Sequence, residues 1–554
     1  MNHIPNESNF HNTPQNMEKE QTPRMQPPQS AQTRQELPYL YGTPFTVQPP
    51  AEKPHFKGVD ALFAFLSVAV GYLFVRSMPV TDTPLGGMLF LWLLFCFGIG
   101  YLLCAKIQIH KLTVPLAVGI AVLSLGLITN GNHTVQGVLF LLILLAFAFW
   151  CYLASGLGGK NPFSERLIPH LYQSVLALPL SSIWHIFPAF GAIGKKGSIN
   201  RKLLHAIGWA LLGLAVAVIP TTIVILLLSY DQSFTALLDH IFSFSLDGFG
   251  EFLGDLILGF LSAIVLFAIL SGIRQAHVKN NGEEQKVEQP NLHILHGALL
   301  CAAVTPILAV YVIFFISQWS YYVSAFTGIL PEDLTYAAYA REGFFQLCGV
   351  CAINAVMLLL FNLLMKERSD GRRSPIRILY SCVISIFTLI LIATALSKMA
   401  LYIGSYGLTQ KRVYASWFML LLAVIFVLVL LSCAIKRLRL LPAVCLVCVL
   451  FFALIAIPNV DGMIADYNVD AYLSNDLKSV DVYALSELGS SAVPALVDLK
   501  EHFDTAKESL TAEEETVKIL LDNVLKNMKE ELDATPNSFF RFNLPDHRAR
   551  IRLQ

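Results

Sequence analysis

Two ionisable side chains lie within apolar stretches of this chain and are the first candidates for chemistry. Asp255 lies near the start of one apolar run, and Lys398 lies near the end of another. A charge at the bilayer centre costs about 2.5–3.5 kcal/mol, so such residues can mark an ion or proton path, and the two could pair across a helix bundle. The simpler alternatives are that Asp255 continues an acidic interfacial run and that Lys398 extends its ammonium group to the membrane surface.

A second candidate is the Arg341–Glu342 pair at the start of an apolar run. A guanidinium group can donate two parallel hydrogen bonds to a phosphate or carboxylate, so Arg341 could hold an anionic lipid headgroup or substrate. The structural alternative is an ion pair that anchors a helix end, with Lys411 and Arg412 of a later connection balancing nearby acidic residues. Asn354 lies further along the same run, and asparagine side chains there commonly form hydrogen bonds between membrane helices.

The remaining polar residues predict neither a metal site nor a cofactor site. His293 and His296 are one helical turn apart, but zinc needs further ligands and the sequence offers none beside them. All ten cysteines lie inside apolar runs, where they are typical of packing residues. No arrangement of nucleophile, base and acid stands out, which favours a protein that is not an enzyme while leaving a membrane enzyme possible.

The composition indicates what surrounds these residues. Of the 554 residues, 55% are hydrophobic and only 14% are charged, whereas soluble domains average about 25% charged. Apolar surface must therefore face lipid as well as a protein core. The formal net charge is zero, which gives no general attraction to nucleic acid. The lipid bilayer is the expected partner.

Long apolar runs predict an all-α, polytopic helical membrane protein with about 11 transmembrane helices, since about 20 apolar residues in a helix cross a hydrocarbon core of about 30 Å. The runs are continuous rather than alternating, which favours helices over a barrel. The expected spans lie near residues 59–75, 84–105, 112–129, 135–155, 203–229, 252–273, 294–319, 343–365, 376–404, 412–435 and 440–457.

The distribution of Lys and Arg predicts the orientation of these spans. Basic residues are concentrated in alternate connections, which places the N-terminus in the cytoplasm and the C-terminus outside. Residues 1–57 are rich in Asn, Gln and Pro, and we expect a disordered cytoplasmic tail there. Residues 58–457 then form the transmembrane domain. Within it, the apolar segment 171–193 contains two prolines and is flanked by basic residues, which favours an interfacial or re-entrant segment.

Residues 458–554 are expected to form a small soluble helical domain outside the membrane. Their apolar residues recur at helical spacing. Thr511 followed by Glu514 matches a helix-capping box. Asp461 and its acidic neighbours lack the glycine and glutamate positions of a calcium loop, which favours a solvated helix face.

Several blocks of the sequence are distinctive. They are SYDQSF (229–234), TYAAYAREGFFQL (335–347), YGLTQKRVY (406–414), ADYNVDAYL (465–473) and VDVYALSELGSSAVPAL (480–496). In these blocks the chain resembles an uncharacterised bacterial multi-pass membrane family that is catalogued as a domain of unknown function. The resemblance runs from about Ala61 to the C-terminus and implies an architecture. It implies no activity, substrate or catalytic residue.

The orientation places all these blocks on the outer side, which points to an outward-facing functional surface that includes Tyr467 and Asn468. The sequence therefore favours a cell-envelope scaffold or sensor in the cell membrane, with a possible envelope protein partner bound through the C-terminal domain. A secondary transporter is the alternative from a different class. An enzyme that acts on lipid-linked substrates is a weaker one.

Overall fold

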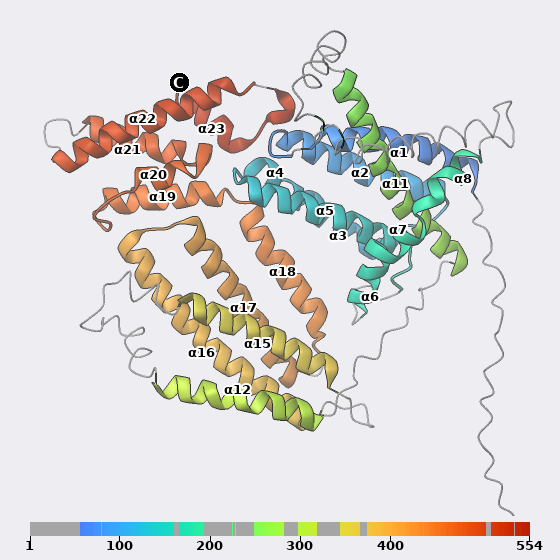
Figure 1. Ribbon diagram of the computed structural model, residues 1–554, viewed down its shortest axis with the longest axis horizontal. Coiled ribbons are helices and arrows are strands. Elements are labelled where there is room, and N and C mark those ends of the chain that lie inside the picture. Colours follow the sequence, from blue (N-terminus) through green and yellow to red (C-terminus); the bar gives the residue numbers. More distant parts are fainter. Residues whose placement is uncertain are drawn as a thin grey trace, which may run out of the picture. The chain divides into compact units, whose positions relative to one another are not determined.

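The computed structural model describes residues 56–78, 80–159, 166–192, 224, 228, 249–281, 297–317, 344–365, 374–435, 437–505, 511–536 and 538–554. Every regular element in these ranges is a helix (Figure 1). Six expectations fall outside the described residues. They are almost all of the N-terminal tail, nearly all of the fifth span, the block SYDQSF, most of the block TYAAYAREGFFQL, the pair His293 and His296, and the pair Arg341 and Glu342.

Eight described helices are long and apolar enough to cross a membrane. They are α1 (Gly58–Arg76), α2 (Pro84–Cys104), the stretch Lys111–Thr129 that contains α3 (Val114–Ser124) and α4 (Gly126–Thr129), α5 (His133–Ala154), α11 (Phe249–Lys279), α12 (Gly297–Ser317), α16 (Pro375–Tyr406) and α17 (Gln410–Ala434).

A ninth candidate span is α18 (Leu440–Ala456), if it is counted together with α19 (Val460–Leu473), from which it is bent by 59°. α15 (Phe344–Leu364) is apolar as well and coincides with the eighth expected span. The described residues therefore form a polytopic helical membrane protein with eight or nine candidate spans. The expected count of about 11 goes beyond this number and includes one span that lies outside the described residues.

The first hydrophobic core forms around α1, α2, α5 and α11, and we call it the N-terminal bundle. Its closest contact lies between α1 and α11. A Cβ atom added to Gly71 would lie 2.0 Å from the backbone oxygen of Gly259, so only glycine permits this approach. Small residues at helix crossings allow such packing between membrane helices.

The segment at 171–193 packs onto this bundle as a broken helix. It comprises α6 (Leu167–Tyr172), a π-helical turn (Gln173–Ala177), α7 (Leu178–Ser181), a 3-10 turn (Ile183–His185) and α8 (Ile186–Phe190). α7 contacts α11, and α8 contacts α1. Pro179 and Pro188 each lack a backbone N–H donor, which accounts for the interruptions. The described part of the segment contains no single helix long enough to span a bilayer.

A second core, the middle bundle, forms around α12, α15, α16 and α17. Its helices are joined by polar side chains as well as by apolar packing. Asn354 on α15 accepts a 2.7 Å hydrogen bond from the Tyr311 hydroxyl of α12 and donates a 2.9 Å bond to Thr388 of α16. The expectation that Asn354 bonds neighbouring helices is thus confirmed.

The third core contains the helices that follow the bend, and we call it the C-terminal cluster. It comprises α19, α20 (Val482–Ser486), α21 (Val493–Thr505), α22 (Ala512–Ala534) and α23 (Leu544–Arg552). The capping box at Thr511 and Glu514 is present at the start of α22, as the sequence predicts. Phe503 of α21 and Leu521 of α22 lie in the centre of this core.

Candidate functional site

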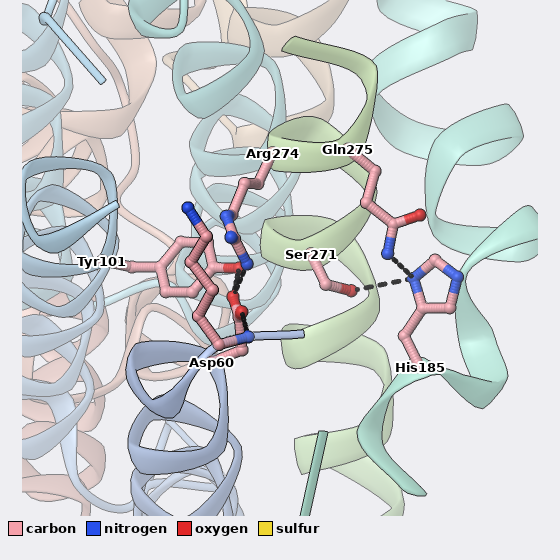
Figure 2. Close-up of polar contacts among 7 residues, drawn as sticks. Asp60, Tyr101, His185, Ser271, Arg274 and Gln275 are labelled. Atoms are coloured by element: carbon pink, nitrogen blue, oxygen red, sulfur yellow. Dashed lines mark hydrogen bonds and ion pairs between the residues drawn. The ribbon is translucent and has the colours of Figure 1, made fainter. Parts of the chain in front are cut away.

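A buried carboxylate at the beginning of α1 is the most unusual ionisable group of the N-terminal bundle. Asp60 has no solvent-exposed surface. One of its oxygens accepts a 2.6 Å hydrogen bond from the backbone N–H of Lys57, so Asp60 caps the start of its own helix. The other oxygen accepts a 2.9 Å bond from the Tyr101 hydroxyl of α2 and forms an ion pair with Arg274 of α11 (Figure 2).

This charge cluster fastens three membrane helices at one end of the bundle. The Arg274 side chain is only 11% exposed, so both charges of the pair are shielded from water. Removing one partner of a buried ion pair costs about 3–5 kcal/mol, because the other charge stays buried without compensation. The sequence pattern does not reveal this site, because Arg274 lies at the start of a connection rich in Lys and Arg and is typical of the basic residues found there. A signal was available, since Asp60 and Arg274 lie at span ends that the charge pattern places on the same side.

A polar contact with His185 lies beside Arg274, on another side of α11 (Figure 2). Nδ1 of His185 lies 3.3 Å from the Ser271 hydroxyl and 3.3 Å from Nε2 of Gln275. Figure 2 shows His185 approaching from the broken segment while Ser271 and Gln275 project from α11 beside Arg274. Phe56 packs edge-on against the imidazole at 5.4 Å. The broken segment is thereby joined to the helix that carries Arg274.

Asp255, the first candidate from the sequence, lies at the opposite end of the α1–α11 pair. Its carboxylate forms a 3.2 Å ion pair with Arg76, and the two side chains are 20% and 60% exposed. The hypothesis that Asp255 pairs with Lys398 is therefore not supported. Lys398 is buried on α16 beside Ala395 and Met399 in the middle bundle.

Arg412 closes the end of α16, whereas Glu332 and Asp333, the acidic residues that it is expected to balance, lie outside the described residues. Its guanidinium group donates hydrogen bonds to the carbonyl oxygens of Tyr406, at 2.9 Å, and Gly407, at 2.5 Å. It also lies over the Tyr402 ring, 4.0 Å from the centroid. These contacts satisfy carbonyl groups that a helix end leaves without intrahelical partners. The neighbouring Lys411 is exposed.

Asn468 joins α19 to the connection between α16 and α17. Its side-chain oxygen accepts a 2.7 Å hydrogen bond from the Leu408 N–H, and its side-chain nitrogen donates a 2.9 Å bond to the Leu408 carbonyl. Gly407 precedes this contact with a φ of +72°, and a Cβ atom there would lie 2.2 Å from the Asn468 oxygen. Two distinctive blocks, YGLTQKRVY and ADYNVDAYL, therefore meet here. Tyr467, in contrast, is 42% exposed.

A second attachment lies at the connection before α5. The Asn130 side chain donates to the carbonyl oxygens of Ile455, at 2.8 Å, and Pro458, at 3.0 Å, on either side of the α18–α19 bend. Asn132 caps α5 and donates a 3.1 Å bond to Asp461 of α19. The interpretation of the acidic residues of α19 as a solvated face holds for Asp466 and Asp470, which are exposed, and is wrong for Asp461, which is buried against this connection.

We call these two attachments the polar junction, and its residues are Asn130, Asn132, Leu408, Asp461 and Asn468. The junction joins the C-terminal cluster to two connections of the membrane helices, and both connections lie on the side that the charge pattern assigns to the exterior. The cluster's own helices are held together separately by their hydrophobic core. A displacement of the cluster would therefore act directly on the ends of α4, α5, α16 and α17.

In the first turn of α22, the carboxylate of Glu514 caps the helix. The backbone N–H of Thr511 donates a 2.7 Å hydrogen bond to the Glu514 carboxylate. This bond, strengthened by one from the Thr511 hydroxyl, lowers the pKa of Glu514.

The comparisons with known proteins agree with the architecture. A family model described as "Domain of unknown function (DUF4153)" matches residues 93–499, which is more than half of the chain and includes the polar junction. All five distinctive sequence blocks fall within the matched residues. No curated protein and no solved structure matches the chain.

Proposed function

We propose that this chain, which belongs to the DUF4153 family of domains of unknown function, is a cell-envelope scaffold or sensor. In this proposal the C-terminal cluster binds an envelope protein outside the cell, and the polar junction transmits that binding to the membrane helices. The N-terminus then lies in the cytoplasm, as the basic connections favour.

The polar junction is the observation that supports this proposal most strongly. A domain that only had to remain near the membrane could be connected to α18 by a flexible linker. Here it is fixed by side-chain amides that bond the backbone at Leu408, Ile455 and Pro458. Buried amide pairs of this kind are costly to break, because each lost partner leaves a desolvated polar group. Such fixed coupling suits a protein that passes a positional signal between the cluster and the membrane.

The partner surface in this proposal is the exposed face of α19. Met463 and Tyr467 lie one helical turn apart and are 61% and 42% exposed, although α19 buries Ile464 and Val469 in the cluster core. Large apolar side chains that remain exposed beside a packed core are typical of protein interaction sites. Met and Tyr are also enriched where proteins meet.

A photo-crosslinking amino acid placed at Tyr467 tests the proposal. In living cells it should form a discrete adduct with an envelope protein, and the same adduct should weaken when Met463 is replaced by Ser. The matched control places the crosslinker at Lys526, a strongly exposed position on α22, where no such adduct is expected. Equal adducts at both positions, or none at either, would contradict the assigned partner surface.

The buried Asp60–Arg274 pair favours a second candidate function, a secondary transporter. Ionisable residues inside a helical membrane protein commonly lie on ion or proton paths. In this alternative, Asp60→Asn abolishes ion flux in proteoliposomes while the protein remains folded. The enzyme hypothesis depends on Arg341, which lies outside the described residues.

A further inference from the structure

A short aromatic segment near the end of the chain remains exposed beside the membrane helices. The 3-10 turn η6 (Phe539–Arg541) precedes α23. Phe539 is 70% exposed, Phe540 is 54% exposed and Phe542 is 39% exposed. Three neighbouring phenylalanines that remain uncovered form an apolar patch of the kind that marks a membrane or protein contact.

Contacts with α2 and with the connection before α5 fix the position of this segment. η6 packs against α2. A Cβ atom added to Gly86, in the first turn of α2, would lie 3.5 Å from the Cβ of Phe540. A Cβ atom on Gly131 would likewise lie 3.4 Å from Pro545 at the start of α23. The aromatic segment therefore lies at the end of α2 where the chain enters that helix.

The length of α2 indicates how deep in the bilayer the first turn of this helix lies. Its 21 residues are apolar throughout and extend about 31 Å, which is close to the hydrocarbon thickness of about 30 Å. The first turn must therefore lie at the boundary between the acyl chains and the headgroups. Trp92 and Leu93, further along α2, are each 42% exposed, as expected of a surface that faces lipid. The phenylalanines next to Gly86 are continuous with that boundary.

Arg541, the charged residue next to the phenylalanines, also suits the boundary between acyl chains and headgroups. Among the described residues, no carboxylate or carbonyl group contacts the side chain of Arg541. Two of the three arginines of α23 differ, since Arg550 donates to the Leu532 and Thr535 carbonyls and Arg552 pairs with Asp498. A guanidinium group at headgroup depth can donate paired hydrogen bonds to a phosphate.

We propose that Phe539, Phe540 and Arg541 form an interfacial anchor for the phospholipid leaflet beside α2. The two phenyl rings insert between the headgroups and the upper acyl chains, and the Arg541 guanidinium binds lipid phosphate. Aromatic side chains and arginine are the usual components of such interfacial contacts. The anchor holds the C-terminal cluster against the membrane surface independently of the polar junction. This inference does not depend on the orientation of the chain or on the proposed function.

Depth-dependent fluorescence quenching tests the anchor in the full-length protein. Phe539→Trp is reconstituted into phosphatidylcholine–phosphatidylglycerol vesicles whose acyl chains carry bromine close to the headgroup. The six native tryptophans contribute equally to every sample, so the wild-type spectrum is subtracted. Ile519→Trp is the matched control, because Ile519 is 60% exposed on α22, a helix that packs on α20, α21 and α23.

The added emission of Phe539→Trp should fall by about half in brominated vesicles, and that of Ile519→Trp should remain within about one tenth of its unbrominated value. Adding Arg541→Gln to Phe539→Trp should reduce the quenching. If Phe539→Trp fails to fold, Phe540→Trp carries the same measurement. The proposal is overturned if the emission of a tryptophan at position 539 or 540 is equal in brominated and unbrominated vesicles. It is also overturned if the tryptophan at position 519 is quenched as strongly as the one at position 539. Protection from aqueous iodide without bromine quenching would show a protein cover and would overturn it as well.

Discussion

Asp60 in the first turn of α1 and Arg274 near the end of α11 form a buried ion pair, to which the Tyr101 hydroxyl adds a hydrogen bond. A second pair, Arg76 with Asp255, joins the same two helices at their other ends. α1 and α11 are therefore antiparallel neighbours with an ion pair at each end, and Gly71 and Gly259 lie in close contact between them.

The two ion pairs should differ strongly in their contribution to stability. Asp60→Asn leaves Arg274 charged and buried, so we expect the free energy of unfolding to fall by about 3–5 kcal/mol. Asp255→Asn removes a more exposed pair and should cost at most about 1 kcal/mol. Equilibrium unfolding in mixed detergent micelles measures both values. Replacing Asp60 and Arg274 together by apolar residues should recover part of the loss, and equal losses for the two Asn variants would contradict the assignment.

The contact between Gly71 and Gly259 should tolerate no side chain. Gly71→Ala places a methyl group against the backbone of α11, and we expect a loss of about 1–3 kcal/mol from overpacking. Gly137→Ala in α5 is the control, since a Cβ there has no atom within 4 Å. That variant should gain up to about 1 kcal/mol from helix propensity. Thermal unfolding compares the stability of the two variants. If Gly71→Ala left the stability unchanged, α1 and α11 would not approach this closely.

Asn468 should be required for the attachment of α19 to Leu408. Asn468→Ala removes both hydrogen bonds of the side-chain amide, so the Leu408 N–H should exchange with deuterium at least about tenfold faster. Tyr467→Ala changes an exposed neighbour and should leave that rate unchanged. Hydrogen-exchange mass spectrometry of the 404–412 region gives the comparison. Unchanged protection in Asn468→Ala would mean that this contact does not hold the cluster.

The N-terminus of α22 should loosen in acid. The hydrogen bonds from Thr511 depress the pKa of Glu514, so its carboxylate stabilises the folded turn above the pKa that it has when unfolded. That stability is lost as the pH falls through the depressed folded pKa. The protection factors of the amides in the first turn of α22, which correct for the slower intrinsic exchange in acid, should therefore fall at low pH in the wild type. Glu514→Gln should already exchange fast at neutral pH, and a pH response identical to that of the wild type would contradict the role of Glu514.

Local features could be predicted from the sequence because they depend on residues close together in the chain. The apolar runs predicted most of the described spans, and Thr511 with Glu514 predicted the start of α22. Asn354 was expected to bond neighbouring helices because an amide in an apolar helix needs a partner. These inferences required only helical geometry and the cost of burying polar groups.

Contacts between distant segments could not be predicted in this way. Asp60 is a helix-capping residue as judged from its neighbours, and only the packing of α11 beside α1 makes it part of an ion pair. The sequence offers Lys398 as a partner for Asp255, but the fold brings Arg76 to it. The acidic stretch around Asp461 favours a solvated helix face, but the connection that carries Asn132 covers this residue. In each case the decisive partner comes from a different helix.

In the proposed orientation, the C-terminal cluster lies outside the cell and is attached there to the membrane helices. The most direct test is to label Glu513→Cys with a membrane-impermeant maleimide in intact cells, since Glu513 lies in the exposed first turn of α22. The native cysteines all lie in the apolar runs, and the unsubstituted protein gives the background. We expect Glu513→Cys to be labelled before lysis to the same level as after it. Labelling that occurs only after lysis would place the cluster in the cytoplasm and rule out the proposed orientation.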